Sequence, residues 1–209
     1  MAWDSVASIW LFLIGLGLSY IGSMPPGLIN LTVTQLALKR NLPAASWAAL
    51  GAAWVEGVQA WVAISFSSLF KTHPEWQMGF RLAAMLIFLA LAAYLIFSPT
   101  EAPKGKEWPR SKSFLVGVGV STLNLLAFPY WFFYGTLLRM EKLLPEGKSH
   151  ILILSIGVAA GTFLLLLSYI RLGQYVTNRL PHLAKWTNRV TAAIFLLLGF
   201  WQAYLLLTT

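Results

Sequence analysis

The stretch SVASIWLFLIGLGLSYIGSMPPGLINLTVTQLAL, residues 5–38, contains no charged side chain and carries two consecutive prolines in its middle. About 20 apolar residues cross a ~30 Å hydrocarbon core, so the stretch predicts a membrane helix. As one helix it would be about 50 Å long, too long for a simple crossing. Pro25 and Pro26 also remove backbone donors and clash with the preceding turn. We therefore predict a discontinuous helix, with one half that ends near Ser23 and a second half that begins near Leu28.

The composition of the whole chain agrees with a membrane protein. Of the 209 residues, 58% are hydrophobic and 11% are charged, which is too little polar surface for a soluble domain of this size. Lipid offers no hydrogen bonds, so the apolar blocks must form helices or a closed barrel. The alternation that is typical of barrel strands is absent. The sequence therefore predicts an all-α membrane protein.

About six spans are predicted, in a single transmembrane domain of residues 1–209. After the first span, apolar blocks lie at about 43–70, 82–98, 113–138, 151–170 and 190–207. Residues 99–112 form a polar linker between a first half, 1–98, and a second half, 113–209. Each half begins with a proline-containing span, so the first and fourth helices are predicted to be broken. Three spans per half is an odd number, which predicts two inverted three-helix repeats, although residue identity between the halves is weak.

The basic residues give the predicted orientation. Loops 1–2, 3–4 and 5–6 contain ten of them and the opposite side contains five, namely Lys71, Arg81, Arg139, Lys142 and Lys148. Because loops rich in Lys and Arg stay in the cytoplasm, both termini are predicted to lie outside. These loops and the lipid headgroups account for the net charge of +8, so no nucleic-acid partner is predicted. We expect a multi-pass protein of the plasma (inner) membrane, with the lipid bilayer as its surroundings.

Glu56 is the strongest functional signal in the sequence. It is the only one of seven acidic residues within a predicted span, and no basic residue lies within any span. A charge at the bilayer centre costs at least ~2.5–3.5 kcal/mol, so it usually marks an ion pathway or a substrate site. Its helix face is small and polar and is predicted to pack inward; the face consists of Ala49, Ala52, Ala53, Glu56, Gln59, Ala60 and Ala63. The alternative is a protonated structural glutamic acid held by hydrogen bonds.

The break at Pro25-Pro26-Gly27 is the second candidate site. Unwound backbone at membrane depth is tolerated where it is buried in protein or lines a cavity. The half-helix that begins near Leu28 would aim its free N–H groups and its positive dipole end at that cavity, where an anion such as a carboxylate can dock. Asn30 lies in its first turn and can donate or accept. The alternative is a plain proline kink that helps packing.

Other residues give weaker signals. Asn124 and Pro129 are the counterparts of the first break in the second half, and Tyr130 and Trp131 beside them are expected to pack more than to line a cavity. Gly157-x-x-x-Gly161 predicts a close contact between helices. The three histidines are unclustered and no nucleophile elbow, Walker loop or HExxH motif is present, and the chain has no cysteine. The sequence therefore predicts no catalytic residue, no cofactor and no metal site.

Three short motifs resemble a known family. In the segment from Met24 to Leu31, Pro25, Gly27 and Asn30 match the pattern Pro-x-Gly-Pro-x-Asn, with Leu28 in place of the second proline. Glu56-Gly57 is similar to an acidic residue before glycine in the following helix. The segment from Asn124 to Pro129 is similar to an Asn-Pro motif of the fourth helix, with Leu125 where proline is expected. The family with these motifs is the LysE/RhtB family of amino-acid exporters, and the resemblance extends over the whole chain in length and span order.

The resemblance implies a six-helix secondary exporter that is driven by an ion gradient and moves amino acids or related molecules. A buried carboxyl group exchanges its proton for a cation that comes close. The hypothesis is therefore alternating-access export of a small zwitterion. The half-helix at Gly27 to Asn30 would receive the carboxylate, and Glu56 would face the ammonium group or a coupling proton. The predicted substrate-binding residues are Pro25, Pro26, Gly27, Asn30, Glu56, Gln59, Asn124 and Pro129, with Glu56 as the proton-coupling residue.

Two other functions stay open at this point. A cation or metal-ion exporter would use the same Glu56 pocket, although one carboxylate without a second acidic residue or a histidine is a thin site for a divalent ion. A non-transporting membrane scaffold would tolerate substitution of Glu56, Pro25 and Asn30. The partners predicted are a small-molecule substrate and a proton or cation as the coupling ion. A homodimer is left open, and the sequence does not identify the substrate.

Overall fold

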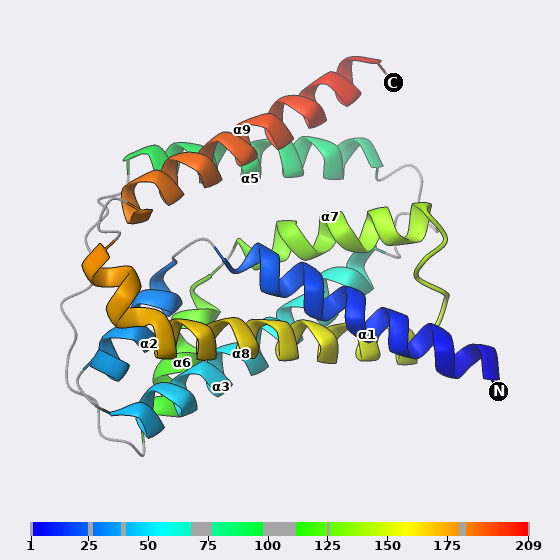
Figure 1. Ribbon diagram of the computed structural model, residues 1–209. Helices are drawn as coiled ribbons and strands as arrows, with labels where there is room; N and C mark the ends of the chain where they lie inside the picture. Colours follow the sequence, from blue (N-terminus) through cyan, green and yellow to red (C-terminus); the bar gives the residue numbers. More distant parts are fainter. Residues whose placement is uncertain are drawn as a thin grey trace.

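A computed structural model of the chain describes residues 2–24, 27–38, 41–67, 77–97, 112–124, 126–179 and 183–208. Within these ranges the protein is helical and contains no strand, as predicted (Figure 1). The helices are α1 (Ala2–Gly22), α2 (Leu28–Leu38), α3 (Leu42–Ser67), α5 (Gln77–Phe97), α6 (Ser113–Thr122), α7 (Ala127–Met140), α8 (Lys148–Arg179) and α9 (Leu183–Thr208).

Several helices have the length and composition of membrane spans. Helix α3 and residues Lys148–Leu172 of α8 are each long and apolar enough to cross a membrane. Helices α6 and α7 together meet the same criterion, with a bend of 68° at the short break between them. Ser8–Gly22 and α2 are shorter apolar helices on either side of the first break. The chain is thus a helical membrane protein, while the layout of six spans stays a prediction.

The two predicted helix breaks are present. Helix α1 ends at Gly22 and α2 begins at Leu28, as expected; Pro25 and Pro26 themselves lie outside the described residues. In the second half, α6 ends at Thr122 and α7 begins at Ala127, so the break lies before Pro129 and not at it. Pro129 falls in the first turn of α7, where the backbone N–H has no helical partner in any case, and there a proline is tolerated.

Helix α3 is the centre of the bundle. It packs against α6, α7, α8 and α2, while α1 lies along α8. One buried apolar cluster surrounds Trp131 and uses the C-terminal half of α3, with Ala60, Ala63 and Ile64. A second cluster joins α2 and α8 to the N-terminal half of α3. Glu56 lies on α3 between the parts that enter these two clusters.

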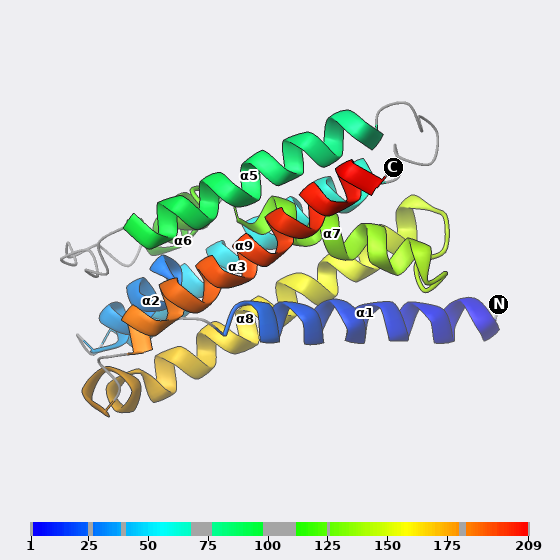
Figure 2. The ribbon, with the colours of Figure 1, turned by 90° about the horizontal axis from the view of Figure 1, so that it is seen from above.

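Helices α5 and α9 form a separate layer. They pack along each other, and they contact the remaining helices mainly through α7. Figure 1 shows this pair above α7, and Figure 2, turned by 90°, shows the two helices running side by side. The candidate residues that the structure describes therefore all belong to the larger bundle of α1, α2, α3, α6, α7 and α8.

Helices α1 and α8 touch backbone to backbone through glycines. A Cβ atom on Gly15 would overlap the carbonyl oxygen of Leu154, and one on Gly157 would overlap the carbonyl oxygen of Phe12. Gly161 meets the carbonyl oxygen of Leu16 in the same way, which confirms the close contact predicted from the Gly-x-x-x-Gly motif.

Helices α6 and α3 repeat this arrangement. A Cβ atom on Gly117 would overlap the carbonyl oxygen of Ala48, and one on Gly51 would overlap the carbonyl oxygen of Phe114. Four of these glycines, Gly15 with Gly157 and Gly117 with Gly51, share one geometry: each meets the residue three positions before its partner glycine. The four glycines are therefore required where two backbones approach closely.

Two segments of the sequence, one in each half, match each other closely. Residues 12–19 read FLIGLGLS and residues 114–121 read FLVGVGVS, so the positions are identical or exchange one branched apolar residue for another. The expectation of weak identity between the halves is therefore wrong for α1 and α6. The two segments are the parts of these helices that contain Gly15 and Gly117.

Candidate functional site

The carboxyl group of Glu56 is surrounded by side chains from three other parts of the chain. Ser23, just after α1, donates its hydroxyl to Glu56 Oε1 at 3.4 Å. Thr162 of α8 lies within hydrogen-bonding reach of the same carboxyl, and the indole N–H of Trp131 on α7 faces it without a hydrogen bond of good geometry. Glu56 itself is half-buried. The predicted inward face of α3 is confirmed, because Ala49, Ala52, Ala53, Gln59, Ala60 and Ala63 are buried.

The groups around Glu56 can serve more than one protonation state. The Thr162 hydroxyl is linked to Ser19 Oγ at 2.7 Å, and it donates to the carbonyl oxygen of Val158 at 3.2 Å. A hydroxyl can donate to a carboxylate or accept from a carboxylic acid, since its hydrogen rotates. The indole N–H of Trp131 can only donate. Two adaptable hydroxyls and one fixed donor therefore face the carboxyl group.

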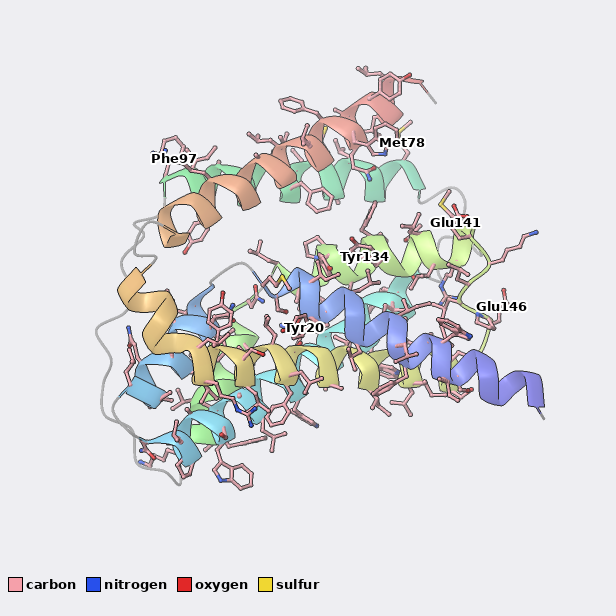
Figure 3. All side chains as sticks on the ribbon, viewed as in Figure 1. Tyr20, Met78, Phe97, Tyr134, Glu141 and Glu146 are labelled. Atoms are coloured by element: carbon pink, nitrogen blue, oxygen red, sulfur yellow. The ribbon has the colours of Figure 1, made fainter. Side chains whose placement is uncertain are left out.

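No cation balances this carboxyl group among the residues that the structure describes. Its neighbours there are neutral donors, and no Lys, Arg or His contributes to its electrostatic surroundings. Within the same ranges, no group of three or more His, Cys, Asp or Glu side chains could hold a metal ion. The acidic residues Glu141 and Glu146 lie where α7 leads into α8, at the end of the molecule (Figure 3). Among the described residues, Glu56 is therefore an acid without a counter-ion, beside the first helix break.

Side chains donate to two carbonyl groups at the first break, those of Ser23 and Met24, and to the Leu18 carbonyl in the last turns of α1. Asn30 Nδ2 donates to the carbonyl oxygen of Ser23 at 2.9 Å. Asn30 therefore links the first turn of α2 to the residue that follows α1. Tyr169 of α8 donates its hydroxyl to the Met24 carbonyl at 2.7 Å, and Tyr130 of α7 donates to the Leu18 carbonyl at 2.9 Å. Two of the three donors thus come from the second half of the chain.

Carbonyl groups at the second break accept hydrogen bonds from a side chain in the first half of the chain. Gln59 Nε2 donates to the carbonyl oxygens of Ser121 and Asn124, at 3.3 and 3.4 Å. The Ser121 hydroxyl donates to the Ala52 carbonyl at 3.2 Å. Gln59 is 5% exposed, and its Oε1 atom is buried with no hydrogen-bond partner. Asn124 enters the site through its backbone carbonyl.

The predicted site residues divide into three groups. Glu56, Gln59, Asn30 and Asn124 come together: Glu56 and Gln59 share a face of α3, Asn30 bonds the residue that donates to Glu56, and Asn124 bonds Gln59. Gly27 lies at the exposed start of α2, and Pro129 lies half-buried in the first turn of α7. Pro25 and Pro26 lie outside the described residues.

Sequence reasoning missed Thr162 and did not select Trp131. The glycines give the signal that would have found Thr162. It follows Gly157 by five residues, as Glu56 follows Gly51, and these two glycines occupy equivalent contacts in α8 and α3. The matching segments also align Ser19, which bonds Thr162, with Ser121, which bonds Gln59 through its carbonyl. Trp131 was expected to pack, and it is the largest fully buried side chain among the described residues.

The prediction for Arg139 is wrong. This residue was expected in a loop, but it lies in the last turn of α7 and is 8% exposed. Its Nε donates to Ser67 Oγ at 3.3 Å and its Nη2 donates to the Ile64 carbonyl at 3.4 Å. A cation at the C-terminal end of α3 also complements the helix dipole. Arg139 therefore joins the ends of α3 and α7.

Replacement of Arg139 by Met should lower the free energy of unfolding by about 1–3 kcal/mol, because the Ile64 carbonyl and the Ser67 hydroxyl lose a charged donor. Thermal unfolding of the purified protein in detergent measures the effect. The control is Arg171→Met on α8, whose side chain is exposed. Equal unfolding temperatures for the two variants would show that the Arg139 contacts contribute nothing.

Comparison with known proteins identifies the family. Neither the curated proteins nor the solved structures gave a match. Residues 20–206 match the family described as LysE type translocator. The matched range includes both helix breaks and Glu56. This match confirms the resemblance carried by residues 24–31, by Glu56-Gly57 and by residues 124–129. Because it covers nearly the whole chain, the protein belongs to the LysE type translocator family, a family of membrane transporters.

Proposed function

We propose that this protein is a secondary active transporter of the plasma membrane that exports a small zwitterionic solute, an amino acid or a derivative. The observation that carries the proposal is the Glu56 carboxyl group. It lies among neutral donors beside the first helix break, and no described cation balances it. An acidic side chain at membrane depth marks an ion or substrate pathway. A proton or the ammonium group of a substrate would supply the missing positive charge.

The hydroxyl groups beside Glu56 support an exchange between proton and substrate. A cation near a carboxyl group favours its charged form, and removal of the cation favours its protonated form. Ser23 and Thr162 can hydrogen-bond to either form, because a hydroxyl donates as well as accepts. Proton uptake when the substrate leaves would couple export to a proton gradient.

The carboxylate of the substrate is proposed to dock at the start of α2. The first N–H groups of a helix lack helical partners, and the dipole there favours an anion. Ser23 connects this place to Glu56: its hydroxyl donates to the carboxyl, while its carbonyl accepts from Asn30 in the first turn of α2. If a zwitterion binds with its ammonium group at Glu56, its carboxylate group would therefore lie close to the start of α2.

Alternating access is proposed to use two inverted repeats of three spans each. In this arrangement α1, α2, α3 and α5 correspond to α6, α7, α8 and α9. The reciprocal glycine contacts of α1 with α8 and of α6 with α3 support this assignment, as do the two matching segments at 12–19 and 114–121. Both breaks would then lie at the interface between the repeats, where transporters of this plan place their substrate.

The experiment is efflux from proteoliposomes that contain the purified protein and an equimolar mixture of the common amino acids. Mass spectrometry of the external buffer follows release with and without a proton gradient, and liposomes without protein are the control. At least one amino acid should leave faster with protein, and faster still with the gradient. Flux of divalent cations in place of amino acids would favour a cation exporter, and no flux of either kind would favour a scaffold.

A further inference from the structure

The side-chain amide of Gln59 has only one chemically reasonable orientation. Its nitrogen lies 3.3 Å and 3.4 Å from the carbonyl oxygens of Ser121 and Asn124. A carbonyl oxygen can only accept, so the group that faces these two oxygens must be the NH₂ end. The Oε1 atom is then directed away from the second break. It is buried, and no described donor reaches it.

Gln59 follows Glu56 by three residues on α3. Residues three apart on a helix are neighbours on one face, with Cβ atoms about 5–6 Å apart. A buried acceptor without a donor costs free energy of about 1–3 kcal/mol, and a ligand that donates to it recovers this cost. The NH₂ end of Gln59 is held by the second break, so the side chain cannot turn to satisfy its oxygen elsewhere without losing two hydrogen bonds.

We propose that Gln59 Oε1 and the Glu56 carboxylate together bind a primary ammonium group, so that the site selects a solute with N–H donors over a quaternary ammonium of the same charge. The proposal rests on the export function stated above and adds the chemical class of the ammonium group. Glu56 supplies the opposite charge. Gln59 determines specificity, because only an ammonium group that carries hydrogen can donate to Oε1.

The aromatic residues near Glu56 offer an alternative way to bind an ammonium group, and the two ways differ in their response to N-methylation. Tyr130, Trp131 and Tyr134 of α7 form a ring cluster, with centroids of Tyr130 and Trp131 5.0 Å apart. An aromatic cluster beside a carboxylate attracts primary and quaternary ammonium groups alike. If this cluster determined recognition, methylation of the ammonium nitrogen would be tolerated. If Gln59 determines it, methylation removes the donor and leaves Oε1 unpaired.

The test uses proteoliposomes loaded with the common primary amino acids and the N,N,N-trimethyl derivative of each. For the amino acids that the wild-type protein releases, we expect release to be about 10-fold to 100-fold faster than that of the trimethyl forms, as for loss of a hydrogen bond to a charged donor. Gln59→Leu should slow release of the primary amino acids by the same factor and change release of the trimethyl forms by less than about 3-fold. The matched control is Gln202→Leu on α9, outside the larger bundle.

Each result has a defined meaning. Release of no amino acid overturns the export function and this proposal with it. Equal release of primary and trimethyl forms by the wild-type protein overturns this proposal alone, whether or not the Gln59 variant folds. If Gln59→Leu slows both forms equally while Gln202→Leu does not, Gln59 only supports the second break and the proposal is wrong.

Discussion

The Glu56→Gln protein should release its amino-acid substrate at least about 100-fold more slowly than the wild type in proteoliposomes with a proton gradient, as expected when one member of a buried charge pair is lost. Glutamine has nearly the same shape and still accepts from Ser23, so the helix contacts are kept. It can neither take up a proton nor carry a negative charge. Both the attraction of the ammonium group and the coupling to the gradient are therefore lost.

The matched control for this variant is Glu141→Gln. Glu141 is exposed just after α7 and lies at the end of the molecule in Figure 3, so its removal should leave efflux unchanged. Thermal unfolding of both variants shows whether either substitution disturbs folding. If folded Glu56→Gln protein exports at the wild-type rate, Glu56 is a structural residue and the proposed mechanism fails.

Alanine at Gly15 or at Gly117 should destabilise the protein by at least about 3 kcal/mol, at the upper end of the cost of overpacking. The new Cβ atoms would overlap the carbonyl oxygens of Leu154 and Ala48, which belong to helix backbone and cannot turn aside as a side chain can. The two helices must separate instead, and the packing of α1 on α8 or of α6 on α3 is lost. Folded yield and unfolding temperature in detergent measure this effect.

The same two helices provide the controls. Gly17 and Gly119 follow two residues later, and a Cβ atom there would meet nothing within 4 Å. Alanine at these positions should be neutral or stabilising by up to about 1 kcal/mol, because alanine favours the helix over glycine. Opposite effects are thus expected for glycines only two residues apart. Similar losses at all four positions would mean that the close contacts do not exist.

The sequence was sufficient to predict features that depend on local chemistry. Two adjacent prolines in an uncharged stretch predict the first break, because proline lacks an N–H group whatever surrounds it. The small residues around Glu56 predict the inward face of α3, because lipid favours larger apolar side chains outside and small ones between helices. The match of residues 20–206 to a translocator family confirms the resemblance that these motifs carried.

Features that depend on contacts between distant parts of the chain could not be predicted in this way. The second break lies before Pro129, in a segment where the Ser121 and Asn124 carbonyls are bonded by Gln59, more than 60 residues earlier. Arg139 reads as a loop residue because only the fold places the end of α3 beside it. Thr162 gives no signal by itself. Only the alignment of α8 with α3 through their glycines shows that its position corresponds to that of Glu56.

The hydrogen bonds of the first break have a consequence for how the protein is made. The Met24 carbonyl accepts from Tyr169, and the Leu18 carbonyl accepts an additional hydrogen bond from Tyr130; both tyrosines are synthesised more than 100 residues later. While the ribosome is still extending the chain, these carbonyls and the acid on α3 are already at the membrane without their eventual partners. These hydrogen bonds can therefore form only after α7 and α8 have been inserted.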